Sequence, residues 1–242
     1  MPPSETQAVL RRAFACWGMP QQLRVDNGTP WGSRGDLPTD LVLWLAGLGV
    51  EVRANPPRRP QDNGVVERSQ GTGKRWAEPH RAASVAELQA AIDAMDRRQR
   101  EGYPYRGRES RRAAHPGLAH SGRVYEEAQE PTLWRIERVH ELLTRFVVAR
   151  QVDRCGTVSV YHRNYYVSKT YVGKVVHVRF DPQQRRWLFQ DESNHLLNHH
   201  EAREIDAARI RGLTVTHRRE RSKDKAKGQL GVGISTVQLD VG

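Results

Sequence analysis

The spacing of apolar residues changes near residue 145, and this change limits the folds that the chain can adopt. Before it, apolar residues recur mainly with the helical period, interrupted by strand-like runs at 22–25 and 50–54. After it, apolar and polar residues alternate with a period of two. The order helix, strand, helix, strand, helix predicts an α/β layered domain, followed by a smaller unit built from strands.

Turn and capping residues set the limits of the predicted helices. Four helices are predicted in the first 100 residues, at 5–17, 37–48, 63–76 and 84–100. The last of these begins with Ser84-Val85-Ala86-Glu87, which is a capping-box sequence. Residues 101–131 are rich in Gly, Pro, Arg and His and keep no period, so they predict a basic linker, with a short helix at 133–143.

The second part of the chain is predicted to be a compact unit of antiparallel strands. Five strands are predicted, at 145–152, 157–161, 165–168, 174–180 and 187–190. Their close spacing favours a small barrel rather than a sandwich. After residue 204 the sequence is highly charged, and 217–227 is almost entirely ionisable, which predicts a basic, disordered tail.

The formal net charge of +11 predicts an anionic partner, for which nucleic acid and anionic membrane are the usual candidates. A high arginine content that reflects codon usage is the alternative. No apolar run reaches 18 residues and the first residues do not resemble a signal peptide, so we expect no membrane span and a cytoplasmic location. Cys16 and Cys155 are too few for a disulfide framework, and His199 and His200 are expected at the surface.

Two carboxylates stand out by their positions. Asp26 follows the strand 22–25 in the turn sequence Asp26-Asn27-Gly28, and Glu67 lies one turn into the helix that starts near Asn63. Phosphoryl transfer on a nucleic acid needs divalent cations held by such carboxylates. Taken singly, each motif is more often an ordinary turn or an ordinary solvated helix face.

Taken together and in this order, Asp26-Asn27-Gly28 and Asn63-Gly64-Val65-Val66-Glu67-Arg68 resemble the catalytic core of DDE-type transposases and retroviral integrases. Glu67 follows Asp26 at a spacing of 41 residues, which suits that family. The resemblance covers residues 5 to about 100. It implies a ribonuclease-H-like fold, Mg²⁺ or Mn²⁺ as cofactor, and transfer of DNA ends by attack of a 3′ hydroxyl.

The resemblance also implies roles for individual residues. Asp26 and Glu67 would bind the metal and act in catalysis, while Asn63, Arg68 and Lys74 would contact DNA. An ordinary cationic helix face is the alternative for Arg68 and Lys74.

The sequence departs from the family pattern at two places. Gly71 and Gly73 stand where larger residues are common, and each costs about 1 kcal/mol of helix propensity relative to Ala. The family's first Asp precedes the opening helix, and no residue before Ala8 could supply it. We therefore expect an N-terminally truncated core with weakened metal binding and impaired catalysis.

The strand-rich part resembles the C-terminal β-barrel of Mu-type transposases, a non-catalytic module that contacts DNA or neighbouring subunits. Arg163 and Lys169 lie among tyrosines there, which suits contacts with phosphate and base. The alternative is that the aromatic residues form the core, and we expect this for Tyr166 and Tyr171.

The sequence thus predicts four parts: a truncated integrase core at 1–100, a basic linker with a short helix at 101–141, a small β-barrel at 142–204, and a basic, disordered tail at 205–242. The expected function is DNA transposition or integration at the bacterial nucleoid, with DNA ends and target DNA as partners and a homo-oligomer as the possible active form. A non-catalytic DNA-binding regulator and a remnant of a decayed insertion element are the alternatives.

Overall fold

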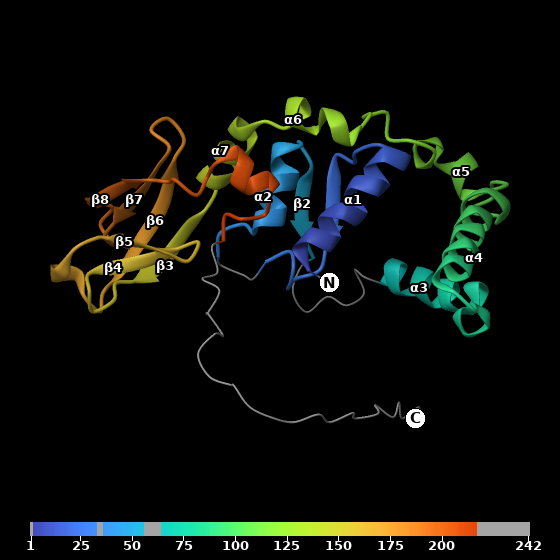
Figure 1. Ribbon diagram of the computed structural model, residues 1–242, viewed down its shortest axis with the longest axis horizontal. Coiled ribbons are helices and arrows are strands. Elements are labelled where there is room, and N and C mark those ends of the chain that lie inside the picture. Colours follow the sequence, from blue (N-terminus) through green and yellow to red (C-terminus); the bar gives the residue numbers. More distant parts are fainter. Residues whose placement is uncertain (1, 33–35, 56–63, 217–242) are drawn as a thin grey trace, which may run out of the picture.

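The computed structural model describes residues 2–32, 36–55 and 64–216, except for the side chains of residues 65–67. Within these ranges the protein mixes helices and strands. Figure 1 shows an elongated molecule, with a strand-rich unit at one end, helices and two strands in the middle, and a helical arm at the other end. None of the described helices combines the length and the apolar composition needed to cross a lipid bilayer.

The middle of the molecule contains the predicted helix and strand alternation. Its elements are α1 (Pro3–Trp17), β1 (Gln22–Val25), α2 (Asp40–Gly47) and β2 (Glu51–Ala54). The strands pair in parallel, from Gln22 opposite Glu51 to Val25 opposite Ala54. α1 ends at Gly18, whose φ of 75° suits glycine and whose N–H bonds to the carbonyl of Phe14 at 2.8 Å. The predicted positions of these four elements are confirmed.

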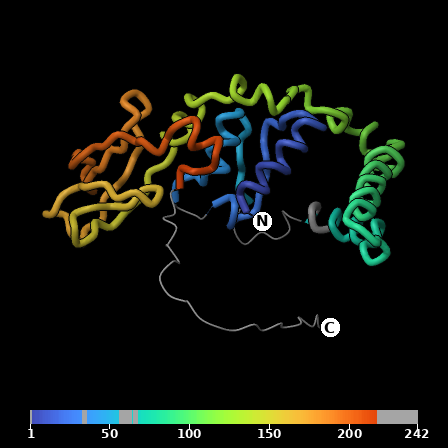
Figure 2. The backbone as a smooth tube through the Cα atoms, in the orientation of Figure 1, coloured from blue at the N-terminus to red at the C-terminus, as the bar shows by residue number. Residues whose placement is uncertain are grey.

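The helical arm comprises α3 (Gly64–Ala77), the 3₁₀ turn η2 (Pro79–Arg81), α4 (Val85–Arg97), the π-helical turn η3 (Arg98–Gly102), α5 (Arg111–Ala114) and η4 (Pro116–Leu118). Ser84 caps α4 by accepting from the N–H of Glu87 at 3.2 Å, as predicted, and Glu87 accepts from the N–H of Ala83 at 2.8 Å. α3 runs unbroken through Gly71 and Gly73. No residue of α4 is buried, and Figures 1 and 2 show α3 beside α4 and away from β1 and β2.

The chain returns from the arm along α1 and α2, through η5 (Glu127–Gln129) and α6 (Glu130–Leu133) to α7 (Ile136–Thr144). The predicted linker is therefore partly ordered. The indole Nε1 of Trp134 donates to the carbonyl of Trp44 at 3.0 Å. This contact requires glycine at 47, because a Cβ there would lie 2.0 Å from the Trp134 ring.

The strand-rich unit has six strands where five were predicted. β3 (Val147–Gln151), β6 (Val175–Asp181), β7 (Arg186–Gln190) and β8 (Leu196–Glu201) form an antiparallel sheet, and β4 (Thr157–Val160) and β5 (Arg163–Tyr166) form a hairpin that η6 (Lys169–Tyr171) follows. The strands of the described residues do not close into a barrel. β8 was not predicted because its sequence, Leu196-Leu197 followed by polar residues, does not alternate apolar and polar side chains. His199 is exposed as expected, whereas His200 is half-buried against Phe189.

The predicted start of the tail at residue 205 is wrong. Residues 205–216 fold back onto the body and contain α8 (Ala207–Arg211), because their apolar side chains find a buried position: Ile205, Ile210 and Val215. The N–H of Thr216 donates to the carboxylate of Asp40 at 3.2 Å. The ionisable segment 217–227 lies outside the described residues.

One continuous core joins the middle of the molecule to the strand-rich unit. It extends from Phe14 through α2 and α7 into the sheet and ends at Val215. The hydroxyl of Tyr161 donates to the carbonyl of Pro38 at 2.8 Å across this junction. The predicted parts 1–100 and 142–204 therefore share a core, whereas the α3–α4 arm contributes only Ala77 to the buried apolar residues of the described ranges.

Candidate functional site

Asp26 lies at the carboxyl end of β1, where the parallel register brings it beside Asn55 at the end of β2. The amide Nδ2 of Asn55 donates to Oδ1 of Asp26 at 3.0 Å, and the Asn55 N–H donates to the carbonyl of Val25 at 2.9 Å. Nδ2 of Asn27 donates to the Asn55 carbonyl at 2.8 Å. Asn55 is buried and Asp26 is exposed, so a fixed amide orients a solvent-facing carboxylate.

The turn after Asp26 explains why this position needs Asn-Gly. Gly28 has a φ of 123°, which favours glycine, and its N–H bonds to the carbonyl of Gly32 at 3.0 Å. The N–H of Gly32 donates back to the Gly28 carbonyl at 3.0 Å, which closes a small loop. The predicted turn is confirmed, and it directs the chain away from the strand end and leaves Asp26 accessible.

The second predicted carboxylate is described only in part. The backbone of Glu67 belongs to α3, but its side chain and all of Asn63 lie outside the described residues, as does the connection 56–63 between β2 and α3. Figure 1 shows α3 beside α4 rather than at the carboxyl ends of β1 and β2. The described residues thus bring Asp26 together with Asn27 and Asn55, and do not bring it together with α3.

The Asp26 carboxylate suits Mg²⁺ or Mn²⁺, since hard cations prefer oxygen ligands. The described residues contain no group of three or more His, Cys, Asp or Glu side chains placed to hold an ion. Asp26 therefore fits as one ligand of a metal, and the described residues do not complete a set of three such ligands around it.

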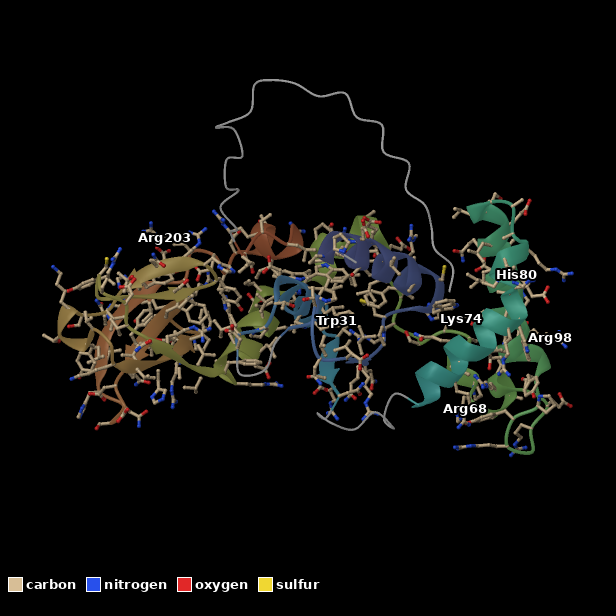
Figure 3. All side chains as sticks on the ribbon, turned by 90° about the horizontal axis from the view of Figure 1, so that it is seen from below. Trp31, Arg68, Lys74, His80, Arg98 and Arg203 are labelled. Atoms are coloured by element: carbon tan, nitrogen blue, oxygen red, sulfur yellow. The ribbon has the colours of Figure 1, made fainter. Side chains whose placement is uncertain are left out.

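The predicted DNA-contacting cations of the arm are both exposed on α3 (Figure 3). Lys74 lies in the last turn of the helix. Arg68 lines a cleft between α3 and residues 99–118, together with Arg75 and Trp76. The sequence interpretation missed this cleft, although residues 98–111 interleave arginines with tyrosines in a pattern that favours nucleic-acid contact.

The predicted cations of the strand-rich unit differ in their surroundings. Nε of Arg163 lies 3.9 Å from the fully buried carboxylate of Glu204. This ion pair partly neutralises the charge of Arg163. Lys169 is exposed at the start of η6. The expectation of a core position is wrong for Tyr166, which is 48% exposed because its strand position faces away from the sheet, whereas Tyr171 is half-buried against the core.

A comparison with models of known protein families gives no match to this chain.

Proposed function

We propose that this chain acts in DNA transposition or integration, in which the 3′ hydroxyl of a DNA end attacks a phosphodiester of target DNA. The observation that carries this proposal is the exposed Asp26 carboxylate, which Asn55 orients at 3.0 Å at the carboxyl end of two parallel strands. Helix α3, with Glu67 near its start, is the next described element after β2. This order is the one that the integrase-like motifs require, and a ribonuclease-H-like core and a barrel-like second module belong to the same proposal.

Each residue has a role in this proposal. Asp26 and Glu67 would hold Mg²⁺ or Mn²⁺, which would polarise phosphate oxygens and lower the pKa of the attacking hydroxyl. Asn63 shapes the approach to the metal ligands. Four cations hold the DNA backbone: Arg68, Lys74, Arg163 and Lys169.

The residues of this chain that match the integrase pattern account for part of its metal site. The integrase pattern uses three carboxylates, and the residues of this chain that match it supply two. Fewer carboxylates hold a divalent cation less tightly. DNA binding does not depend on that site, so it should persist without strand transfer.

A non-catalytic DNA-binding regulator is the second candidate function. The packing of α3 against α4 favours it, because this arrangement does not bring α3 to the carboxyl ends of β1 and β2, where Asp26 lies. The two functions share the partner and differ in chemistry. An isolated chain that binds DNA ends without cutting or joining them would compete with an active enzyme for those ends.

A strand-transfer assay tests the proposal. The purified chain is incubated with Mn²⁺, a supercoiled plasmid and labelled duplexes that cover the DNA flanking its own reading frame. Weak joining that Asp26→Asn and Glu67→Gln abolish, but Asp93→Asn on α4 does not, would support the enzyme. DNA binding without joining would support the regulator. Joining that survives Asp26→Asn would contradict the catalytic role, and absent or salt-insensitive DNA binding would contradict both functions.

A further inference from the structure

The arm contains a cleft whose chemistry differs from that of the Asp26 site. It lies between α3 and residues 99–118 and encloses about 770 Å³, within the ~300–1,000 Å³ typical of sites for small ligands. Four arginines line it: Arg68, Arg75, Arg106 and Arg111. No carboxylate stands among the described residues that line it.

The arginines of the cleft are not paired with acidic side chains of the part of the chain that the structure describes. Within the described ranges, none of the four arginines forms a salt bridge, whereas Arg112, next in sequence to Arg111, pairs with Glu101 at 3.1 Å. The Nε atom of Arg111 is buried and has no hydrogen-bond partner among those residues. Like charges that line one cleft repel one another, and a bound anion relieves the repulsion.

Aromatic rings lie among these cations. The guanidinium groups of Arg106 and Arg111 both lie over the Tyr105 ring, 5.2 Å and 5.5 Å from its centroid. Trp76 and Tyr103 meet at a centroid distance of 5.6 Å with their planes 55° apart, and they are 37% and 51% exposed. The guanidinium of Arg98 also lies over the Trp76 ring, 5.1 Å from its centroid. The exposed parts of Trp76 and Tyr103 beside these arginines provide stacking surfaces for nucleic acid bases, and the arginines provide contacts for phosphates.

These observations select the form of nucleic acid. Inside a duplex each base is covered on both faces by its neighbours, whereas an unpaired base offers a face to Trp76 or Tyr103. We propose that this cleft binds one or two unpaired nucleotides of single-stranded DNA, with the bases on the aromatic rings and the phosphates on the arginines. The choice of DNA over RNA rests on the proposed function, whereas the preference for a single strand rests on the cleft itself.

The test is fluorescence anisotropy of the full chain with a labelled oligothymidylate of about 12 nucleotides, which suits the ~4–16 nucleotides of single-strand sites. The comparison ligands are a duplex, an abasic strand and an RNA strand, all of equal length. Trp76→Leu should weaken binding of the thymidine strand about 5- to 100-fold, as expected for loss of base stacking, and leave duplex binding within about two-fold. Arg111→Gln should weaken binding of both the thymidine strand and the abasic strand.

Two variants control for general effects. Trp17→Leu removes another exposed tryptophan that has an arginine over its ring, outside the cleft, and Arg12→Gln removes an exposed arginine of α1. Both should leave single-strand affinity within about two-fold of the parent protein. Trp76→Phe keeps an aromatic face and should recover part of the lost affinity, which separates stacking from a failure of the arm to fold.

Several outcomes would overturn the inference. Equal binding of the abasic and thymidine strands would exclude stacking, and equal loss in Trp17→Leu and Trp76→Leu would exclude the cleft. Tighter binding of RNA than of DNA would reject the assignment to DNA. The result is independent of strand transfer, since a chain that joins no DNA ends can still show the single-strand preference. If the preference for a single strand is absent while salt-dependent duplex binding persists, the inference about the cleft fails and the proposed function is not affected.

Discussion

The indole Nε1 of Trp187 donates to Oε1 of Glu204 at 2.7 Å, and neither side chain is exposed to solvent. The Tyr165 hydroxyl donates to the other oxygen of the same carboxylate. The bonds connect β7, β5 and the segment before α8, so Glu204 holds the β4–β5 hairpin against the sheet. A buried carboxylate is tolerated only when donors surround it in this way.

Removal of this carboxylate should destabilise the protein strongly. Glu204→Ala leaves Trp187 and Tyr165 with buried donors that have lost their acceptor, so the free energy of unfolding should fall by about 3–5 kcal/mol. Glu204→Gln keeps one acceptor and should cost about 1–2 kcal/mol. Urea unfolding followed by tryptophan fluorescence measures both. Glu201→Ala, at an exposed ion pair, is the control and should change stability by less than ~0.5 kcal/mol; an equal loss there would contradict the assignment.

A second buried carboxylate should make stability depend on acidic pH. Glu130 accepts two hydrogen bonds from Arg11, at 2.9 and 2.8 Å, one from Trp44 at 3.0 Å and one from the Tyr125 hydroxyl. Burial by itself raises the pKa of Glu130, but these hydrogen bonds outweigh burial and hold the pKa below its ordinary value. The ionised form is therefore favoured in the folded state.

The lowered pKa of Glu130 determines how stability changes with pH. The stabilisation by Glu130 is complete above the unfolded-state pKa, about 4.3, and is lost as the pH falls through the lower folded-state pKa. Glu130→Gln should lower stability at pH 7 and flatten the loss of stability below about pH 4.3. Urea midpoints between pH 3 and 7 measure both effects. Glu127→Gln, at an exposed carboxylate 3.7 Å from Arg11, should leave the acid profile unchanged.

His140 should add pH dependence in a higher range. Burial lowers its pKa, and the charge of Arg185 adds to the effect, so the folded protein favours the neutral ring. The ring packs on Phe180 with a centroid distance of 5.2 Å. The unfolded chain takes up the proton first, so this contribution is present above about pH 6.5 and is lost as the pH falls below it.

His140→Leu tests this by removing the titrating group while keeping an apolar side chain against Phe180. The stability of the variant should vary less between pH 8 and 5 than that of the parent, as chemical denaturation at each pH would show. His80→Gln, at an exposed position in η2, serves as the control. An unchanged pH profile in His140→Leu would mean that another group titrates there.

The sequence predicted local elements better than their assembly. The bounds of β1 match because the alternating sequence of the strand ends at Asp26-Asn27-Gly28, a turn signal that depends only on neighbouring residues. β8 was missed because its sequence does not alternate, and α8 was missed because its signal is tertiary: Ile210 is buried by elements far away in the chain. A local pattern cannot show that a charged segment folds back onto Asp40.

For the candidate site too, the sequence predicted the local feature but not the contact between distant residues. Asp26 was found from its turn, but its partner Asn55 was not, since only the parallel register of β1 and β2 brings them together. The cleft in the arm was missed for a similar reason. Trp76 lies on α3 and Tyr105 lies in the segment between η3 and α5, and no spacing rule connects them.

Two glycines with opposite surroundings should respond in opposite ways to alanine. A Cβ at Gly47 would lie 2.0 Å from the indole of Trp134, so Gly47→Ala should separate α2 from the α6–α7 segment and cost about 1–3 kcal/mol or more. A Cβ at Gly71 meets nothing within 4 Å, so Gly71→Ala should stabilise α3 by about 1 kcal/mol. Thermal unfolding measures the first, and helical circular dichroism measures the second. A stabilising Gly47→Ala would contradict the close approach of Trp134.

The exposed lysines of the arm and of the strand-rich unit should contribute separately to DNA binding. If Lys74 and Lys169 each contact a phosphate, Lys74→Gln and Lys169→Gln should each reduce the slope of log K against log salt by about 0.9 on duplex DNA. The double variant should lose about 1.8, because residues on separate units that share no partner act additively. Arg12→Gln removes a charge from α1 and should leave the slope unchanged. Equal slopes in Lys74→Gln, Lys169→Gln and Arg12→Gln would mean that the lysines act only through net charge. Titrations at several salt concentrations measure the slope of each variant.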